Sequence, residues 1–402
     1  MKTILLCGQL FTAEDERIQQ NMAVLVCEQG IEAIAPIDAA TAWEGERIDL
    51  TRSFVMPGLI DAHIHGCASG GNELTDLHKL IGTCVFDMLE NVRADMLAGF
   101  TTLRDEGAYH FVDVSVRNAI AAGRAVGPRL LVSGLPIGAT GGHADEHYAP
   151  PFDAVTASLI VDSPDAARRA ARHNVKYGVD QLKLMATGGV MSLGSEPGAQ
   201  ELTFDEMRAV IEVAEMQGKL TSAHAHGAAG IKTAIRAGIT SIEHGMMLDE
   251  ECIELFVKHG TYLIPTIIAG HQIVVEGPAM KLNPATVEKS RRCLEHHAIN
   301  LQKCRKAGVK IGFGTDAGTP ANMHGKQALE FQLMTEVGFT PMETLLAATR
   351  VNARMIRREQ SIGTLAPGKL ADIIALPESP LQDITALARV QFVMVGGAVV
   401  RA

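Results

Sequence analysis

The feature of the sequence that most constrains its fold is an alternation of short apolar runs with longer helix-like stretches between about Phe54 and Arg354. Such an alternation is typical of repeated βα units, in which strands and helices follow each other and the strands form a parallel sheet. Eight of the apolar runs have the length and composition of strands. They cover residues 59–65, 101–105, 129–133, 181–185, 220–224, 241–244, 262–266 and 310–316.

The stretches between these runs carry helix signals. Residues 164–177 are rich in alanine and follow Ser163, a suitable N-cap residue. Residues 203–217 have apolar side chains at helical spacing and end before Gly218. Because eight parallel strands, each followed by a helix, are the number that closes a barrel, we predict an α/β fold of the (β/α)8 TIM-barrel type.

Both ends of the chain have a different pattern. Short β-rich runs at residues 23–26, 373–376 and 392–395 are separated by Gly and Pro turns. We predict that residues 1–55 and 359–402 together form one small β-sandwich domain, and that residues 56–358 form the barrel. The alternative, in which each end packs on the barrel separately, fits the composition equally well.

Composition restricts the class of partner. The chain has 402 residues, of which 47% are hydrophobic and 20% are charged, so it can bury a large core. Its formal net charge of -10 and its pI near 5.8 argue against binding to nucleic acid or to an anionic membrane. We therefore expect a small-molecule substrate, no nucleic-acid partner and no membrane partner. The size is compatible with a symmetric homo-oligomer.

Cysteine usage and the N-terminal residues indicate the compartment. The apolar stretch from Ile4 to Cys7 ends at Gly8 and is too short for a signal peptide, and no apolar run has membrane-spanning length. The seven cysteines show no CxxC spacing, so they predict neither a disulfide framework nor a thiolate zinc site. We expect a cytoplasmic protein with inert thiols.

Two histidines close the first predicted strand. His63 and His65 are two residues apart, so on a strand their side chains point to the same face and can grip one cation. A His-x-His pair taken alone is better explained by structure than by function. Its position favours function, because TIM-barrel enzymes assemble their active sites at the carboxyl ends of the strands.

Four further polar residues end later strands and precede Gly-rich or polar loops. Each has a structural alternative when it is considered singly: a solvated lysine, a hydrogen-bonded core histidine or a helix cap. Taken together at the ends of a ring of strands, they predict a site for a borderline cation such as zinc, to which imidazole and carboxylate ligands are suited. These residues are Lys183, His224, His244 and Asp316.

With these residues in place the chain resembles the amidohydrolase superfamily over nearly its whole length. The resemblance rests on residues 57–65, Lys183, His224, His244 and the Gly-Thr-Asp of residues 314–316, and it extends to residues 363–372. Residues 182–190, 141–143 and 222–227 are similar to the imidazolonepropionase-related group of that superfamily, which includes Xaa-Pro dipeptidases and arginine or lysine carboxypeptidases.

The resemblance implies two divalent metal ions, zinc by default, with manganese, cobalt or iron as alternatives. It implies that His63, His65 and Asp316 hold the more buried metal, that His224 and His244 hold the second, and that Lys183 bridges both. An ammonium would be repelled by two cations, so Lys183 is a ligand only if CO₂ has converted it to a carbamate. Metal-activated hydroxide would then attack the carbonyl carbon, with Asp316 as the proton shuttle.

Three other histidines are candidates for substrate binding. By the resemblance, His143 in its Gly-rich loop hydrogen-bonds the oxyanion, against the alternative of an ordinary loop histidine. His226 shares a face with His224 and is placed to meet a substrate carboxylate. Proline-cleaving relatives commonly carry tyrosine there, which shifts the expectation away from Xaa-Pro substrates. His324 follows Asp316 and either lines the same opening or lies on the surface.

We therefore expect a binuclear metal-dependent amidohydrolase that cleaves a peptide-like amide bond in a dipeptide or an N-acyl amino acid. One alternative is hydrolysis of a cyclic amide, urea or lactone, or a deamination, on the same barrel. A more remote alternative is a non-catalytic scaffold. Arg104 and Asp105, at the end of the second strand, either orient metal ligands or form a structural ion pair.

Overall fold

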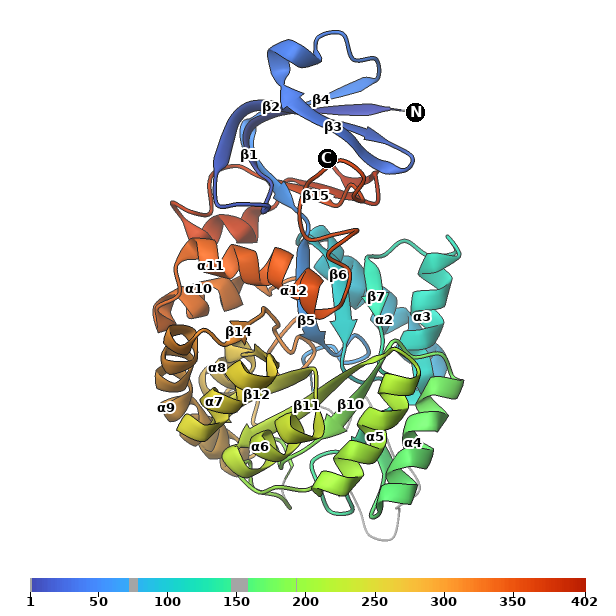
Figure 1. Cartoon of the computed structure of the whole chain (residues 1–402), viewed down its shortest axis with the longest axis vertical. Helices are drawn as coiled ribbons and strands as arrows, with labels where there is room; N and C mark the ends of the chain where they lie inside the picture. Colours follow the sequence, from blue (N-terminus) through green and yellow to red (C-terminus); the bar gives the residue numbers. More distant parts are fainter. Residues whose placement is uncertain (1, 72–78, 146–157, 193) are drawn as a thin grey trace. The chain divides into compact units, whose positions relative to one another are not determined.

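The computed structural model describes residues 2–71, 79–145, 158–192 and 194–402. The chain forms two compact units, and each is discontinuous in sequence. The first unit consists of Met1–Asp61, Arg93–Thr102 and Gly325–Ala402, and the second consists of Ala62–Val92 and Leu103–His324. Figure 1 shows the helices and strands along the chain.

Strands from both ends of the chain form one sheet in the first unit. The strand order is β17-β16-β15-β4-β1-β2-β3, with β1 parallel to β4 and β4 antiparallel to β15. The pair of Val55 with Ala375 therefore joins the N-terminal strands to the C-terminal ones. The strands are β1 (Thr3–Phe11), β2 (Ile18–Cys27), β3 (Gly30–Pro36), β4 (Glu46–Pro57), β15 (Ile373–Leu376), β16 (Phe392–Val395) and β17 (Ala398–Arg401).

Alternating side chains of these strands form a core cluster. Leu5, Val24, Val55, Ile373 and Phe392 are among its members, and each is at most 2% exposed. The apolar residues recur at every second position because successive side chains of a strand point to opposite faces. The β-rich runs expected at 23–26, 373–376 and 392–395 thus correspond to β2, β15 and β16.

The first unit also contains short helices, and those between residues 328 and 355 lie in the range predicted for the barrel. The Asn352 side chain donates a hydrogen bond to the carbonyl oxygen of Ile60, and the Leu59 amide donates one to Gly99. These bonds tie residues 93–102 and the segment after residue 325 to the start of β5. The helices are η1 (Ile37–Ala40), α10 (Ala328–Val337), α11 (Pro341–Leu346), η3 (Ala347–Val351), α12 (Asn352–Met355) and η4 (Ile384–Arg389).

The strands of the second unit lie in two sheets, and β5 and β6 begin in the first unit. One sheet has the order β5-β6-β7, and the other has the order β14-β13-β12-β11-β10-β8-β9 with every pair parallel. The strands are β5 (Leu59–Ile64), β6 (Phe100–Asp105), β7 (Arg129–Leu131), β8 (Ile137–Gly138), β9 (Leu159–Ile160), β10 (Gln181–Met185), β11 (Leu220–Gly227), β12 (Ser241–Met247), β13 (Tyr262–Ile264) and β14 (Lys310–Ile311).

Each of the eight predicted strand runs contains a strand, so the expected α/β fold with a parallel sheet is confirmed. Backbone hydrogen bonds continue beyond the sheet edges. The Ala62 amide donates to the carbonyl oxygen of Phe313, 3.0 Å away, and the Asp180 amide donates to that of Val132, 2.8 Å away. The first bond connects β5 with the segment after β14, and the second connects the end of β7 with the start of β10.

Helices follow most of these strands (Figure 1). The predicted helix after Ser163 is α4, and the Ser163 hydroxyl accepts a hydrogen bond from the Ala166 amide. The predicted helix after Thr203 is α5, and Thr203 and Glu206 form a complete capping box there. The helices are α2 (Ile81–Leu97), η2 (Tyr109–Phe111), α3 (Val112–Ala121), α4 (Pro164–Lys176), α5 (Phe204–Met216), α6 (Ala228–Ala237), α7 (Glu250–His259), α8 (Ile267–Glu276) and α9 (Pro284–Ala307).

The cysteines and the helices can be compared with what the sequence predicts for them. All seven cysteines are free, and six of them are buried, as a set of inert thiols requires. None of the helices formed by the described residues combines the length and the apolarity that a membrane span needs.

The capping box of α5 yields a stability prediction. Thr203→Ala removes the oxygen that accepts from the Glu206 amide, so the free energy of unfolding should fall by about 1 kcal/mol. Thr203→Ser keeps the hydroxyl and should cost much less. Urea denaturation followed by circular dichroism measures both variants. Equal losses in the two variants would contradict a capping role.

Candidate active site

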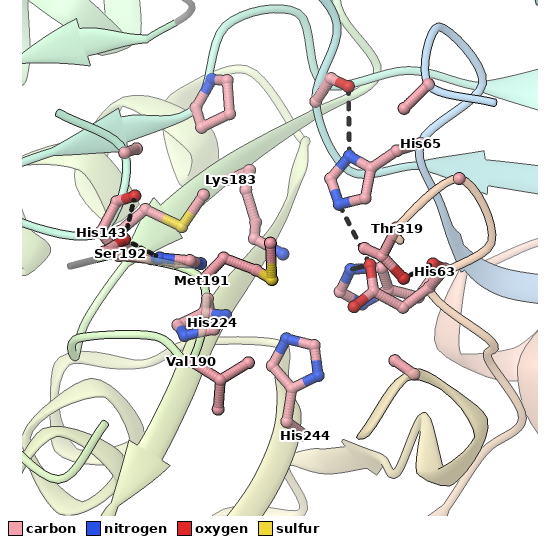
Figure 2. Close-up of a pocket in the computed structure, with 18 of the residues that line it drawn as sticks. His63, His65, His143, Lys183, Val190, Met191, Ser192, His224, His244 and Thr319 are labelled. Atoms are coloured by element: carbon pink, nitrogen blue, oxygen red, sulfur yellow. Dashed lines mark hydrogen bonds and ion pairs between the residues drawn. The ribbon is translucent and has the colours of Figure 1, made fainter. Parts of the chain in front are cut away.

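Eight of the nine residues selected from the sequence line a single cavity (Figure 2). They stand at the carboxyl ends of strands of the second unit or in the loops that follow. β5 supplies His63, β10 supplies Lys183, β11 supplies His224 and His226, and β12 supplies His244. The loops supply the other three, which are His65, His143 and Asp316.

The tightest group in the cavity is His63, His244 and Asp316. One donor atom of each residue lies within 4.8 Å of the others, and all three side chains are buried. The Oδ1 atom of Asp316 lies 3.3 Å from Nε2 of His63 and 3.2 Å from Nε2 of His65. That oxygen is fully buried, yet it accepts no hydrogen bond of good geometry from the described residues. A buried carboxylate oxygen that faces two imidazole nitrogens in this way suits a cation.

A second group of imidazoles packs around His224. Its ring centroid lies 4.2 Å from that of His143 and 4.6 Å from those of His226 and His244. Burial lowers the pKa of His143 to about 4 and that of His226 to about 3. Burial, together with neighbouring imidazoles, also lowers the pKa of His224 and His244 well below the usual value. These rings are neutral at pH 7, and a neutral imidazole keeps the lone pair that a metal ligand needs.

The electrostatics at His63 are different. Burial and the Lys183 ammonium lower its pKa, but Asp316 and Glu243 outweigh them and raise it to about 9. Burial raises the pKa of Asp316, but His63 and His65 hold it well below the usual value. In the absence of a cation the pair is therefore an imidazolium and a carboxylate, and a metal ion would take the place of the imidazolium proton.

The backbone is strained at two of these residues. His244 has φ 70° and Asp316 has φ 59°, a left-handed conformation that residues other than glycine rarely adopt. This backbone conformation changes the direction of each side chain at the end of its strand. A strained conformation of this kind persists where the surrounding structure enforces it. Gly314 lets the preceding segment approach β5, because a Cβ atom there would lie 3.0 Å from Cβ of His63.

The three predicted substrate-binding histidines have different positions. Nδ1 of His143 lies 2.7 Å from the Ser192 hydroxyl, and the ring faces the cavity. His226 also lines the cavity, and its Nδ1 is buried without a hydrogen-bond partner among the described residues. Nε2 of His324 lies 3.0 Å from the carbonyl oxygen of Ala68, and His324 is absent from the cavity wall.

Two glutamates that the sequence analysis did not select contact the site. Glu243 Oε2 lies 2.8 Å from Nδ1 of His63, and Glu106 Oε2 lies 3.2 Å from Nζ of Lys183. Both carboxylates are fully buried. The sequence carried a signal for them, because a charged residue within or just after a predicted buried strand needs a partner. The partner itself was not visible from the sequence.

The rest of the cavity wall is largely apolar. Figure 2 places Val190 and Met191 beside the histidines, and Ser192 beside His143. No arginine is present among the described residues of the wall, so Lys183 is its only basic side chain other than histidine. The further apolar lining includes Met185, Met246, Ala269 and Ile273.

Comparisons with known proteins agree with this geometry. The family model described as the amidohydrolase family matches residues 54–400. Ochratoxinase of Aspergillus niger is 31% identical over 426 residues, which cover 95% of this chain and 82% of that protein. Imidazolonepropionase of Rhizorhabdus wittichii is 25% identical over 386 residues, which cover 89% and 88%.

Among solved structures, a Xaa-Pro dipeptidase with methionine bound in its active site is similar over 100% of both chains, with a TM-score of 0.94 and 32% identity. The chain therefore belongs to the amidohydrolase family, and the resemblance found in the sequence is confirmed. It is a metal-dependent hydrolase of carbon–nitrogen bonds. Its imidazoles and the buried Asp316 oxygen are the donors that such a metal requires.

The close approach at Gly314 yields a second stability prediction. In Gly314→Ala the new Cβ would lie 2.4 Å from Cγ2 of Ile264 and 3.1 Å from the His63 backbone nitrogen. Overpacking of this kind costs about 1–3 kcal/mol, so the melting temperature should fall and metal binding should weaken with it. Gly82→Ala is the matched control, because its Cβ meets no atom within 4 Å. Equal melting temperatures in the two variants would refute the packing argument.

Proposed function

We propose that this protein is a binuclear metal-dependent amidohydrolase that cleaves the amide bond of a dipeptide or an N-acyl amino acid. The observation that carries the proposal is the convergence of neutral, buried imidazoles and Asp316 on one cavity with a partly apolar wall. Similarity to a Xaa-Pro dipeptidase and to ochratoxinase supports an acyclic amide over a cyclic one.

In this proposal His63, His65 and Asp316 would hold one metal, His224 and His244 would hold the second, and Lys183 would act as a ligand of both in the form of a carbamate. When bound, the two cations lower the pKa of a water molecule and polarise the carbonyl oxygen of the substrate. Zinc is the default for such a donor set. Lys183 is buried among these residues, which is where a bridging carbamate would have to lie.

Asp316 is the proposed proton carrier. Its Oδ1 faces the cavity without a hydrogen bond from the described residues, so it is available to accept the proton of the attacking water. The same oxygen then donates that proton to the nitrogen of the leaving amine. His63 and His65, each within 3.3 Å of this oxygen, stabilise its charged form between turnovers.

His143 is proposed to donate from Nε2 to the oxygen of the scissile carbonyl. A neutral imidazole carries one N–H, so Nε2 donates only if Nδ1 accepts. The Ser192 hydroxyl lies 2.7 Å from that Nδ1 and 3.0 Å from the His143 carbonyl oxygen. The Ser192 hydroxyl donates to that carbonyl oxygen in the structure, so this proposal requires its single hydrogen to turn to Nδ1 when His143 donates from Nε2.

The wall of the cavity bears on the substrate. Apolar side chains such as Met185 and Met246 favour an uncharged group on one side of the amide. His226, with a buried and unpartnered Nδ1, is the proposed partner of a carboxylate on the other side. His324 has a secondary place in this proposal, since it binds the loop after β5 instead of facing the cavity.

We also propose that the two sheets of the second unit form one closed (β/α)8 barrel over residues 56–358, with residues 1–55 and 359–402 in the small β-domain. The backbone bonds from Ala62 to Phe313 and from Asp180 to Val132 support closure, because they link β5 to the segment after β14 and the end of β7 to the start of β10. The parallel pairing of all neighbouring strands in the larger sheet also supports a closed barrel.

The test is the metal content per subunit together with hydrolysis of a library of dipeptides and N-acyl amino acids. The protein is purified with zinc and bicarbonate, and the residue that leaves as the amine is varied. About two metals with turnover of some member is the expected result. Two metals without turnover would move the assignment to cyclic amides, ureas or lactones.

The proton-carrier role predicts the effect of Asp316→Asn. Asparagine keeps the size of the side chain but neither accepts nor returns the proton, so kcat should fall by about 10²–10⁴-fold at saturating zinc. The melting temperature should stay near that of the wild type. Steady-state kinetics on the best library substrate measures the change, and wild-type turnover would refute the mechanism.

The bridging role predicts the effect of Lys183→Ala. Loss of the carbamate should reduce both bound metal and activity, and a short carboxylate such as propionate in the buffer should restore part of each. Lys303→Ala, at a half-exposed lysine paired with Glu250, is the control and should bind the wild-type amount of zinc. Full zinc occupancy in Lys183→Ala without added carboxylate would disprove the bridge.

A further inference from the structure

A buried arginine, Arg104, contacts two buried glutamates that in turn contact residues of the cavity wall. Arg104 belongs to β6, and its side chain is only 1% exposed. Its Nη2 lies 2.8 Å from Oε1 of Glu243, and its Nε lies 2.9 Å from Oε1 of Glu106. We propose that Arg104, through Glu243 and Glu106, fixes the positions of the two metal-site residues His63 and Lys183.

The first branch runs from Arg104 to His63. Glu243 accepts from the guanidinium through Oε1, and its other oxygen, Oε2, lies 2.8 Å from Nδ1 of His63. A carboxylate only accepts, so Nδ1 of His63 carries the hydrogen of this bond. The lone pair of the neutral ring is then on Nε2, the nitrogen that lies 3.3 Å from Asp316. Glu243 thus selects the tautomer that can bind a cation.

The second branch runs from Arg104 to Lys183. Oε1 of Glu106 lies 2.9 Å from Nε of Arg104, and its other oxygen, Oε2, lies 3.2 Å from Nζ of Lys183. The contact suits both forms of the lysine. An ammonium donates to Glu106, and a carbamate still keeps one N–H on the same nitrogen. Glu106 can therefore hold that N–H toward itself and direct the carboxyl part of a carbamate to the cavity.

Neighbouring polar side chains donate hydrogen bonds to both glutamates. Ser241 donates to Glu243, while Ser222 and Gln181 donate to Glu106. Gln181 also lies 3.4 Å from Arg104 through its amide oxygen. These partners come from β10, β11 and β12, so the network links the segment that carries Arg104 and Glu106 to three strands of the other sheet. Each carboxylate keeps one orientation because its oxygens already have partners.

Stability alone does not account for this network. Burying ion pairs in place of apolar side chains is often neutral or costs stability, because the charges lose their hydration. Carboxylates that accept from a metal-binding histidine are, in contrast, a common means of orienting the ring and increasing its basicity. The two glutamates each contact one residue of the proposed metal centre, which is the arrangement that positioning requires.

The inference rests on the metal centre of the proposed function, so its test measures metal binding and the carbamate instead of hydrolysis. Glu243→Gln and Glu106→Gln keep the side-chain volume but remove the charge, and both should bind zinc about 10–100-fold more weakly in competition with a chelator. Glu106→Gln should in addition lose the ¹³C carbamate signal at bicarbonate concentrations that saturate the wild type. Glu243→Gln should keep that signal.

Asp180→Asn is the matched control. It removes an ion pair of 2.6 Å with Arg117 in the same unit, and neither residue lines the cavity. Its zinc affinity should equal that of the wild type, whatever its melting temperature. Wild-type zinc affinity in both glutamate variants would overturn the inference and leave the proposed function intact. A wild-type protein that binds no zinc would overturn both.

Discussion

The structure depends on the parallel pairing of strands, because it brings the carboxyl ends of distant segments to one place. In the register of β10, β11 and β12, Met185 pairs with His224 and Ala225 pairs with His244. Residues that are 39 and 19 positions apart in the sequence thus become neighbours. The donors of the candidate metal centre converge for this reason, and none of them needs a local motif to reach the others.

Burial gives these donors their chemistry. The imidazoles of His143, His224, His226 and His244 lose hydration and lose their protons with it, which leaves lone pairs directed at the cavity. Isolated charges are unfavourable in the same buried interior. Arg104 is accordingly paired with two carboxylates, those of Glu106 and Glu243. The low dielectric constant of the interior therefore explains both the neutral imidazoles and the paired charges of Arg104 and the two glutamates.

Much of the fold was predictable from the sequence, since apolar runs and helix signals are local patterns. β10 was predicted to the residue, and α4 and α5 within one residue at each end, because Ser163 and Thr203 mark their starts. The last strand was predicted to be longer than it is. β14 covers only Lys310–Ile311, because the segment after it bends to bring Asp316 to the cavity with a left-handed backbone.

The sequence by itself determined the family, the strand order along the chain and the candidate donors, because residue types at strand ends carry that information. Only the tertiary structure decided which donors contact each other. It placed Glu243 against His63 and Glu106 against Lys183, and it turned His324 toward the loop after β5. These contacts join segments up to 259 positions apart, and a distance of that kind is set by packing in three dimensions and not by any local pattern.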